Sequence, residues 1–329
     1  MRLPDLTGRR DIVKKLFISA IISAFMGLPA HSAEWPTRSV TLIVGYAPGG
    51  STDIVARVLA ASLSKKLGVA FVVENKSGAN GDIAASELVN STPDGYNLMV
   101  TTDSITASPA IRKTRYDPIK DFTPIAMLAT GPFLLAANPS VKANSVSELI
   151  SLARNDPEKY SYATSGVGNS QHFAGEKFNA MTGLTLVHVP YRGGGAAITD
   201  LLSNQVPLGF LGTGPLMQYV QTHKIKPLAV TSIKRSPLLP NVPTLDESGL
   251  SGYDMSTWIG LIGPAGLPDQ MVEKLNKEIT QALQEPDIKK QINNAGMEPT
   301  SYSAAEFTDR LKDSFLKFKE LAESQRMTD

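Results

Sequence analysis

Three times along this chain an apolar stretch typical of a β-strand leads into a glycine-rich turn and then into an amphipathic helix. The turns occupy residues 45–53, 164–172 and 189–196. A strand followed by a helix and then by another strand forms a unit whose strands are parallel and whose helix covers the sheet. The chain is therefore expected to adopt an α/β fold built on two parallel-stranded sheets.

Each turn is also a potential binding site for an anion. The first N–H groups of a helix have no intrahelical partner and carry the positive end of the helix dipole, and glycine lets a ligand approach the backbone closely. A carboxylate or a phosphate can bind there without a lysine. None of the three turns carries the side chains that a catalytic site needs, so the pattern favours binding without chemistry.

The order of the predicted elements indicates two domains, which suits a chain of 329 residues. The expected strands lie at 39–46, 69–74, 97–102, 133–138, 160–164, 184–189, 206–211, 225–231 and 258–262, and the closing helices at about 268–283, 286–295 and 303–325. We place domain 1 at 34–135 plus 258–329 and domain 2 at 136–257. Ligands bind beyond the carboxyl ends of parallel strands, so the expected site is a cleft between the domains.

Side-chain spacing defines the helices after the turns. Val55, Leu59 and Leu63 recur at intervals of four, and Ser51 or Thr52 is expected to cap that helix. In the helix after the second turn, the face that packs on the sheet is expected to carry Ala174, Phe178 and Met181. Near the second domain crossing, Tyr253 and Trp258 are expected to be packing residues.

The amino terminus has the pattern of an export signal at residues 1–33. Five basic residues precede an apolar run and a small-residue stretch near Ala33: Arg2, Arg9, Arg10, Lys14 and Lys15. The apolar run from Leu16 to Leu28 is shorter than the roughly 20 residues that span a bilayer, so a retained anchor is the weaker alternative. Arg9 and Arg10 also resemble a twin-arginine signal, which leaves Sec and twin-arginine export both open. The predicted location is the periplasm.

Charge and composition exclude several classes of partner. The full chain has a net charge of +1, and removal of residues 1–33 takes away five basic and two acidic residues, which leaves about −2. Without runs of Lys or Arg, nucleic acid and anionic lipid are not expected partners. There is no cysteine, and the four histidines lack the H-E-x-x-H spacing, so we expect no metal site and no cofactor.

Enzymatic alternatives lack the motifs that they require. A G-x-S-x-G elbow is absent, so a hydrolase that uses Ser165 or Ser170 with His172 has little support. The chain has no P-loop, and Gly166 and Gly168 are followed by Gln171 where a dinucleotide fingerprint needs glycine or alanine. We therefore expect a protein that is not an enzyme.

Four polar side chains near the turns have alternative roles. Asp53 is expected to hold the first turn by accepting backbone N–H groups, because it would repel an anionic ligand. Arg192 can pair with a carboxylate or remain solvated, and Tyr191 can donate its hydroxyl or line the cleft. Asp103 is a candidate to accept a ligand ammonium or hydroxyl group.

These motifs resemble the extracytoplasmic solute receptors of tripartite tricarboxylate transporters, the Bug family, from Trp35 almost to the carboxyl end. The resemblance is carried by residues 43–53, 74–81, 93–96, 116–122, 165–172, 188–194, 228–232, 235–237 and 242–244. It implies the two-domain periplasmic-binding-protein fold with a cleft between the domains. It also implies a small organic acid as ligand, a tripartite tricarboxylate transporter permease as partner, and a monomer.

The resemblance also implies which residues bind the ligand. One carboxylate would be held by the first turn and enclosed by the other two, and residues after the third strand can reach the same cleft. The predicted ligand-binding residues are Pro48, Gly49, Gly50, Ser51, Asp53, Thr102, Ser104, Thr164, Ser165, Gly166, Asn169, His172, Tyr191, Gly194 and Ala196. The chain departs from the family at Ser108, where Asn is frequent, and at Leu211, where an acidic residue is common. Both positions are expected near the distal end of the ligand.

The sequence thus favours a periplasmic receptor for a carboxylate-bearing metabolite: a di- or tricarboxylate, an aromatic acid or an acidic amino acid. One alternative is a ligand sensor of the same fold that acts on a signalling partner. The other is the periplasmic serine hydrolase built on Ser165 or Ser170 with His172.

Overall fold

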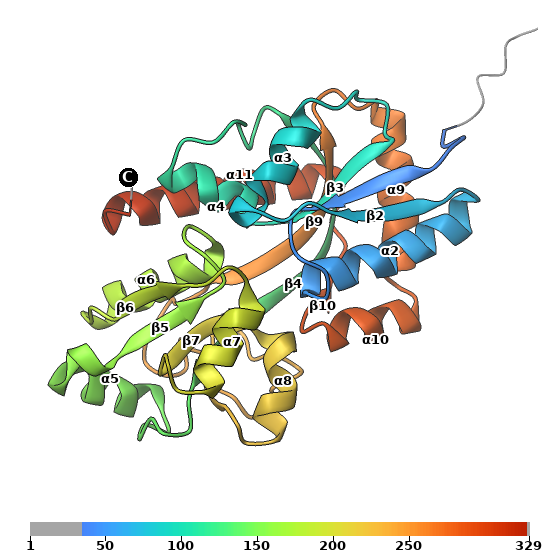
Figure 1. The fold of residues 1–329 in the computed structure, drawn as a ribbon. Helices are drawn as coiled ribbons and strands as arrows, with labels where there is room; N and C mark the ends of the chain where they lie inside the picture. Colours follow the sequence, from blue (N-terminus) through green and yellow to red (C-terminus); the bar gives the residue numbers. More distant parts are fainter. Residues whose placement is uncertain (1–34, 328–329) are drawn as a thin grey trace, which may run out of the picture. The chain divides into compact units, whose positions relative to one another are not determined.

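The computed structural model of the protein describes residues 35–327, so the predicted export signal at residues 1–33 lies outside the described residues. The chain from Arg38 onward forms one compact unit of alternating strands and helices (Figure 1). The strands are β1 (Val40–Val44), β2 (Phe71–Asn75), β3 (Asn97–Thr102), β4 (Phe122–Ala137), β5 (Ser161–Thr164), β6 (Val187–Pro190), β7 (Leu208–Gly212), β8 (Lys226–Val230), β9 (Ser256–Pro264) and β10 (Glu298–Pro299). The α-helices are α2 (Ser51–Leu67), α3 (Asp82–Val89), α4 (Ser104–Ile111), α5 (Val146–Asn155), α6 (Ser170–Thr182), α7 (Gly194–Leu202), α8 (Thr213–Gln221), α9 (Asp269–Ala282), α10 (Pro286–Asn294) and α11 (Ala304–Ser324).

The strands form two parallel cores that a pair of antiparallel strands joins. The strand order is β2-β1-β3-β9-β4-β7-β5-β6, with β8 and β10 also paired to β4. Strand β1 is parallel to β2 and β3, and β5 is parallel to β6 and β7. Between the two cores, β9 is antiparallel to both β3 and β4. The α/β class with two parallel cores is as predicted, and the strands that link them are an addition.

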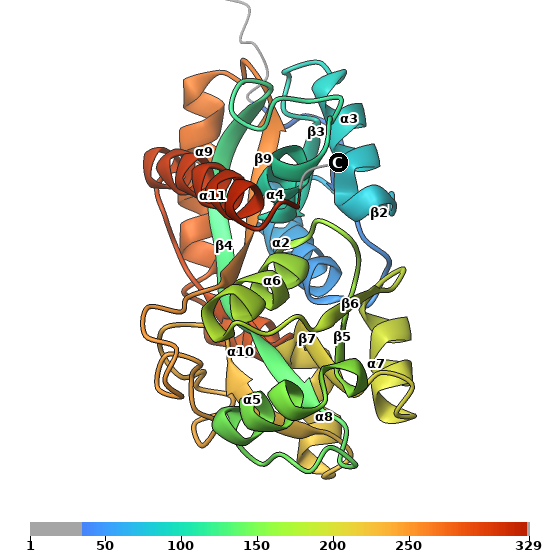
Figure 2. The same ribbon diagram turned by 90° about the vertical axis from the view of Figure 1, so that its left-hand side faces the viewer.

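Strand β4 begins well before the predicted start at residue 133. It is 16 residues long, and Figure 2 shows it passing from one parallel core to the other. Its pairing with β9 shifts register between Pro124 and Ala126 and again between Met127 and Ala129. Such bulges accommodate a proline, which cannot donate to a neighbouring strand. Because of its prolines, the first half of β4 was not predicted as a strand.

Helix α2 forms from the predicted apolar spacing but begins differently. Val55, Leu59 and Leu63 are buried, and Gly68 ends the helix in the left-handed conformation at φ 72°. The cap residue is Gly50, without a side-chain cap, so the predicted cap by Ser51 or Thr52 is wrong. Ser51 instead donates its hydroxyl to the carbonyl oxygen of Ala295 at 2.7 Å. Because the cap residue Gly50 has no side chain, it offers no side-chain acceptor to the first amides of α2.

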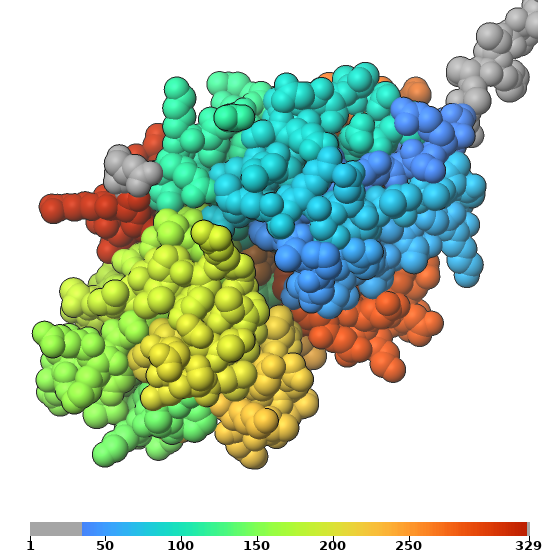
Figure 3. Space-filling view, in the orientation of Figure 1, coloured from blue at the N-terminus to red at the C-terminus, as the bar shows by residue number. Residues whose placement is uncertain are grey.

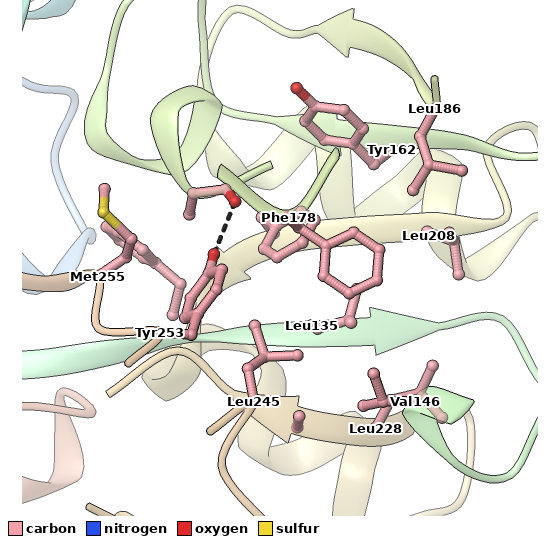
Figure 4. Close-up of a cluster of buried hydrophobic side chains, with 14 of the residues drawn as sticks. Leu135, Val146, Tyr162, Phe178, Leu186, Leu208, Leu228, Leu245, Tyr253 and Met255 are labelled. Atoms are coloured by element: carbon pink, nitrogen blue, oxygen red, sulfur yellow. Dashed lines mark hydrogen bonds between the residues drawn. The ribbon is translucent and has the colours of Figure 1, made fainter. Parts of the chain in front are cut away.

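The core around β4, β5 and β7 contains several fully buried aromatic side chains (Figure 4). Tyr253 is buried and donates its hydroxyl to the carbonyl oxygen of Ala174 at 2.6 Å, and Trp258 is buried as well, so both pack as predicted. Phe178 is buried on α6, but Met181 is 39% exposed. Its predicted place on the packed face is wrong, because the face that α6 buries carries Phe173, Phe178 and Thr182 instead.

The last three helices lie close to their predicted bounds, and α11 packs against both parallel cores. Phe307 and Leu311 contribute to the cluster that contains Trp258, whereas Phe318 lies 4.7 Å, ring to ring, from Phe173 of α6. The short helices α4 and α8 were not predicted, since each contains a proline. The domain boundaries at residues 135 and 257 stay a prediction.

Candidate functional site

A network of side chains holds the first glycine-rich turn. Asp53 accepts hydrogen bonds from the Gly49 N–H at 2.9 Å, from Arg57 Nε at 3.0 Å and from Asn75 Nδ2 at 2.8 Å. The same Asn75 amide donates to the carbonyl oxygen of Tyr46 at 3.0 Å. Burial acts to raise the pKa of Asp53, but these hydrogen bonds hold it below its usual value. The carboxylate is thus bonded to its own turn, as expected from the sequence.

The first turn leaves open space beside the start of α2. Gly49 has φ +88°, and a Cβ added there would meet no atom within 4 Å; one added at Gly50 would approach only the Ala47 carbonyl oxygen, at 3.9 Å. Since the first N–H groups of a helix lack intrahelical acceptors, this end of α2 offers donors beside open space. The predicted residues Pro48, Gly49, Gly50 and Ser51 therefore lie together at an uncapped helix terminus.

The third turn has the same character at the start of α7. Gly193 has φ +113° and precedes the helix without a side-chain cap. Added Cβ atoms at Gly193, Gly194 or Gly195 would meet nothing within 4 Å. Figure 3 shows the surface hollowed between the blue segment that leads into α2 and the yellow segment of α7. Two uncapped helix termini thus border one hollow.

The second turn is closed on itself. Asn169 caps α6 by accepting from the His172 N–H at 3.0 Å, and the Ser165 N–H donates to Gln171 Oε1 at 2.8 Å. The Gly168 N–H donates to the His172 ring nitrogen Nδ1 at 3.2 Å. These bonds use the backbone donors that the other two turns leave open.

The second turn contacts the other parallel core instead. Asn80 Nδ2 donates to the carbonyl oxygen of Val167 at 2.5 Å, and Ser170 Oγ donates to Asp103 Oδ1 at 2.9 Å. A Cβ on Gly166 would lie 2.6 Å from Asn80 Oδ1. Asn80 was missed in the sequence. Its only signal was an Asn between Ala79 and Gly81 in a glycine-rich turn, and it has φ +58°.

Asp103 does not face the hollow. Its Oδ1 also accepts from Thr257 Oγ1 at 2.7 Å, and the residue is 2% exposed. Burial raises its pKa to about 6, although the two hydroxyl donors and the positive charges of Arg310 and Lys317 act in the opposite direction. The expected contact with a ligand is replaced by a bond that ties α6 to β9.

Thr102 and Ser104 are connected to the first turn through Tyr46. The hydroxyls of Tyr46 and Thr102 lie 2.7 Å apart, and the Ser104 N–H donates to Thr102 Oγ1 at 3.2 Å. The Tyr46 hydroxyl also contacts the carbonyl oxygen of Asn80 at 3.2 Å. Because Asn80 bonds Val167, a continuous chain of contacts runs from the first turn to the second.

His172 stacks on His188 with ring centres 3.9 Å apart, and His188 Nε2 lies 2.7 Å from Thr164 Oγ1. Burial lowers the pKa of His172 to about 4; burial and the neighbouring ring lower that of His188 to about 3. Both rings are therefore neutral near pH 7. The rings fill space behind the second turn without adding a positive charge.

Tyr191 joins the third turn to the second. Its N–H donates to the Thr164 carbonyl oxygen at 3.0 Å, and its hydroxyl donates to Asp200 Oδ2 at 2.8 Å. Burial and the Asp200 carboxylate raise the pKa of Tyr191 to about 12. Ala196, in the first turn of α7, is exposed. The hydroxyl of Tyr191 is thus held by the helix that follows it.

The two positions at which the chain departs from the family lie inside the protein. Leu211 is 1% exposed and packs with Leu134 and Leu216, and Ser108 is fully buried and accepts from Arg112 at 3.2 Å. The expectation that they meet the distal end of a ligand is not supported by this placement.

The hydrolase constellation is not assembled. Ser170 donates to Asp103 and Ser165 accepts from Asn169, so neither is hydrogen-bonded to the His172 ring in the structure. Within residues 35–327, no cluster of three or more His, Asp or Glu side chains is placed to hold a metal ion. No helix in that range is long and apolar enough to cross a membrane.

Two parallel cores joined by long strands, with uncapped helix termini at a hollow, define a solute-binding receptor of the periplasmic class. The periplasmic binding protein BugD has this fold: it is 32% identical, with a TM-score of 0.80 over 89% of this chain and 99% of BugD. The model of the tripartite tricarboxylate transporter family receptors (TctC) matches residues 55–326, and the chain belongs to this family. Receptors of this family are periplasmic transport proteins and not enzymes, which confirms the prediction that the chain has no catalytic activity.

Two solved structures of similar proteins contain carboxylates. R. palustris Rpa4515, solved with adipate, is 35% identical, with a TM-score of 0.84 over 89% of this chain and 98% of that one. MatC from Rhodopseudomonas palustris, solved with bound malate, is 29% identical, with a TM-score of 0.79 over 87% of this chain and 99% of MatC.

Proposed function

We propose that this protein captures a small carboxylate-bearing metabolite in the periplasm and delivers it to the membrane permease of a tripartite tricarboxylate transporter. The ligand is a di- or tricarboxylate, an aromatic acid or an acidic amino acid. Adipate in Rpa4515 and malate in MatC support this class. The protein would act as a monomer after export by a Sec or twin-arginine signal.

The observation that carries the proposal is the pair of uncapped helix termini at the hollow. The amides at the starts of α2 and α7 lie beside open space at Gly50 and Gly194. Hydrogen bonds to a charged acceptor each contribute about 1.5 to 3 kcal/mol, and micromolar binding requires about 8 kcal/mol in total. A few amide donors on one carboxylate can therefore supply most of that free energy. A neutral sugar would gain much less from them.

The three turns then have different roles. We assign direct contact with the carboxylate to the first and third turns, through Pro48, Gly49, Gly50, Ser51, Gly194 and Ala196. Asp53, Thr102, Ser104 and Tyr191 hold these turns in place through the bonds described above. The second turn, with Thr164, Ser165, Gly166, Asn169 and His172, would complete the enclosure when the predicted domains close.

A thermal-shift screen tests the proposal. The protein without residues 1–33 is heated with malate, adipate, citrate, benzoate, glutamate and glucose in turn. A ligand at about 100 times its dissociation constant should stabilise the protein by about 2.7 kcal/mol. Stabilisation by glucose alone would contradict the proposal.

Gly50→Val is the matching variant. Gly50 has φ −79°, so a side chain fits the backbone there and projects toward the open space. Because valine is a poorer helix cap than glycine, the variant should melt slightly lower without ligand, and it should lose the shift that a carboxylate produces. Ala180→Val, on the exposed face of α6, is the control and should keep that shift. A shift that survives in Gly50→Val would remove the first turn from the site.

A further inference from the structure

A second concave surface lies along α2, on the side that faces α10. Helices α2 and α10 lie side by side in Figure 1, and a groove of about 650 Å³ runs between them. Its lining residues are Ile54, Arg57, Val58, Ala61, Ser62, Lys65, Lys66, Glu285, Ile288 and Gln291. In Figure 3 this boundary is where blue atoms meet orange atoms, on the face that the figure draws.

The groove has an apolar floor and a basic rim. Val58 and Ile288 are 8% and 7% exposed and form the floor. Three cations and one carboxylate line the rim: Arg57, Lys65, Lys66 and Glu285. The chain without residues 1–33 has a net charge of about −2, so this basic rim differs in sign from the protein as a whole.

The rim cations differ in how far they are already paired. Lys66 Nζ lies 3.3 Å from Glu285 Oε1, and Arg57 is bonded to Asp53. For Lys65, which is exposed, the structure of residues 35–327 records no ion pair. The groove therefore holds unneutralised positive charge above an apolar floor, which suits a segment with acidic side chains along one side and apolar ones along the other.

Contacts connect this groove to the ligand hollow at both helices. On α2, Arg57 holds the Asp53 carboxylate that fixes the first turn. At the end of α10, the Ala295 carbonyl oxygen accepts from Ser51, the first residue of α2. A Cβ on Gly296 would lie 2.1 Å from the backbone nitrogen of Gly214, at the start of α8, so the α10 terminus also touches the other parallel core directly. Through α2 and α10, the groove is thus in contact with the first turn and with the other parallel core.

We propose that this α2–α10 groove is the docking surface of the receptor, and that its occupant is an acidic, amphipathic segment of the membrane permease. This proposal rests on the proposed function, because delivery requires a permease to recognise the receptor. The amino-terminal segment of the chain does not suit the groove, since residues 1–33 carry five basic and two acidic residues. Charge complementarity of this kind speeds association and selects the partner.

A peptide experiment tests the chemistry of the groove. The probe is a synthetic amphipathic helix with leucine on one face and glutamate on the other, and its counterpart carries lysine in place of glutamate. Fluorescence anisotropy should show binding of the glutamate peptide alone. Lys65→Glu should weaken that binding by about tenfold at low salt. Lys142→Glu, which makes the same charge change beside α5, should not alter it. Equal binding of both peptides would overturn the proposal.

Crosslinking in cells tests the occupant. A photo-crosslinking amino acid replaces Ser62 in the groove wall or, as control, Ser151 on the exposed face of α5 in the full chain. An adduct with an integral membrane protein at position 62 alone, lost in Lys65→Glu, is the expected result. An adduct with a second copy of the receptor, or no adduct at position 62, would overturn the proposal.

The two proposals can fail separately. Lys65→Glu should keep the thermal shift produced by a carboxylate, because Lys65 touches neither α7 nor the first turn. If no carboxylate stabilises the wild-type protein but the adduct at position 62 forms, docking stands and the ligand class is wrong. If carboxylates bind but neither the adduct nor the peptide complex forms, the groove is not the docking surface.

Discussion

The first and second glycine-rich turns look alike in the sequence and are used in opposite ways. In the first, Gly50 caps α2 without a side chain and the helix amides remain open. In the second, Asn169 caps α6, and the side chains of Gln171 and His172 take further backbone N–H groups. The residue at the helix cap, and not the number of glycines, decides whether such a turn can bind an anion.

Glycine substitution should separate the closed second turn most strongly from an open turn, here the third. Gly168 has φ +73°, and a Cβ there would lie 2.3 Å from Ile111 Cδ1. Gly168→Ala should therefore cost about 2 to 4 kcal/mol of unfolding free energy, from backbone strain and overlap. Gly194→Ala meets no atom within 4 Å and should change stability by less than about 0.5 kcal/mol. Urea unfolding of both variants measures the contrast, and similar losses would contradict it.

Acid should weaken the closed turn through its buried titratable groups. Between pH 6 and pH 4 the unfolded chain protonates both His172 and His188, whereas the folded chain keeps them neutral and protonates Asp103. The unfolded state then binds one more proton than the folded state from these three groups. Their joint contribution to stability should fall by about 1.4 kcal/mol for each pH unit below 6.

Asp103→Asn measures the contribution of Asp103 to this difference in bound protons. Asn can still accept from Ser170 and Thr257, but it removes the proton that the folded state gains. The fall with decreasing pH should become about twice as steep, near 2.7 kcal/mol per pH unit. Chemical unfolding at a series of pH values measures both slopes. Equal slopes in the two proteins would show that Asp103 is not protonated in this range.

Removal of the cap should have a smaller effect. Asn169→Ala deletes the acceptor for the His172 N–H and the donor to Ser165, which should cost about 1 kcal/mol. Asn169→Asp keeps the acceptor and serves as control. If thermal unfolding of Asn169→Ala equals that of the wild type, the cap does not stabilise the second turn.

The smallest effect on stability is the most informative about binding. Gly50→Asn gives α2 the kind of cap that α6 has, and the extended backbone at φ −79° and ψ 167° allows it. The gain should be only a few tenths of a kcal/mol, because glycine is already a tolerable cap. The new side chain should nevertheless compete with a carboxylate for the same amides. Unchanged ligand affinity by calorimetry would show that these amides do not bind it.

Local patterns predicted much of the fold. Helix α2 and the last three helices follow the spacing of their apolar residues, which depends only on neighbours along the chain. Strand β4 could be only half predicted, because Pro124 and Pro132 interrupt its pattern and bulges in its pairing with β9 compensate. Such compensation comes from a partner strand more than a hundred residues away in the chain.

The sequence predicted where the site lies but not which role each of its residues has. The glycine patterns located all three turns, and the bonding of Asp53 to its own turn followed from its charge. The role of Asn80 did not, since its bond to Val167 joins residues 87 positions apart. Asp103 looked suited to a ligand until the fold placed Ser170 and Thr257 beside it.

The continuity of β4 through both parallel cores has a mechanical consequence. Where two halves of a protein are joined by loops, they can swivel freely, but here any rotation must bend β4, which pairs with β9 in one core and with β7 in the other. Bending β4 at that point would strain the ladder hydrogen bonds that it makes on either side. A receptor built this way would store elastic energy on closing and use it to reopen once its cargo has left.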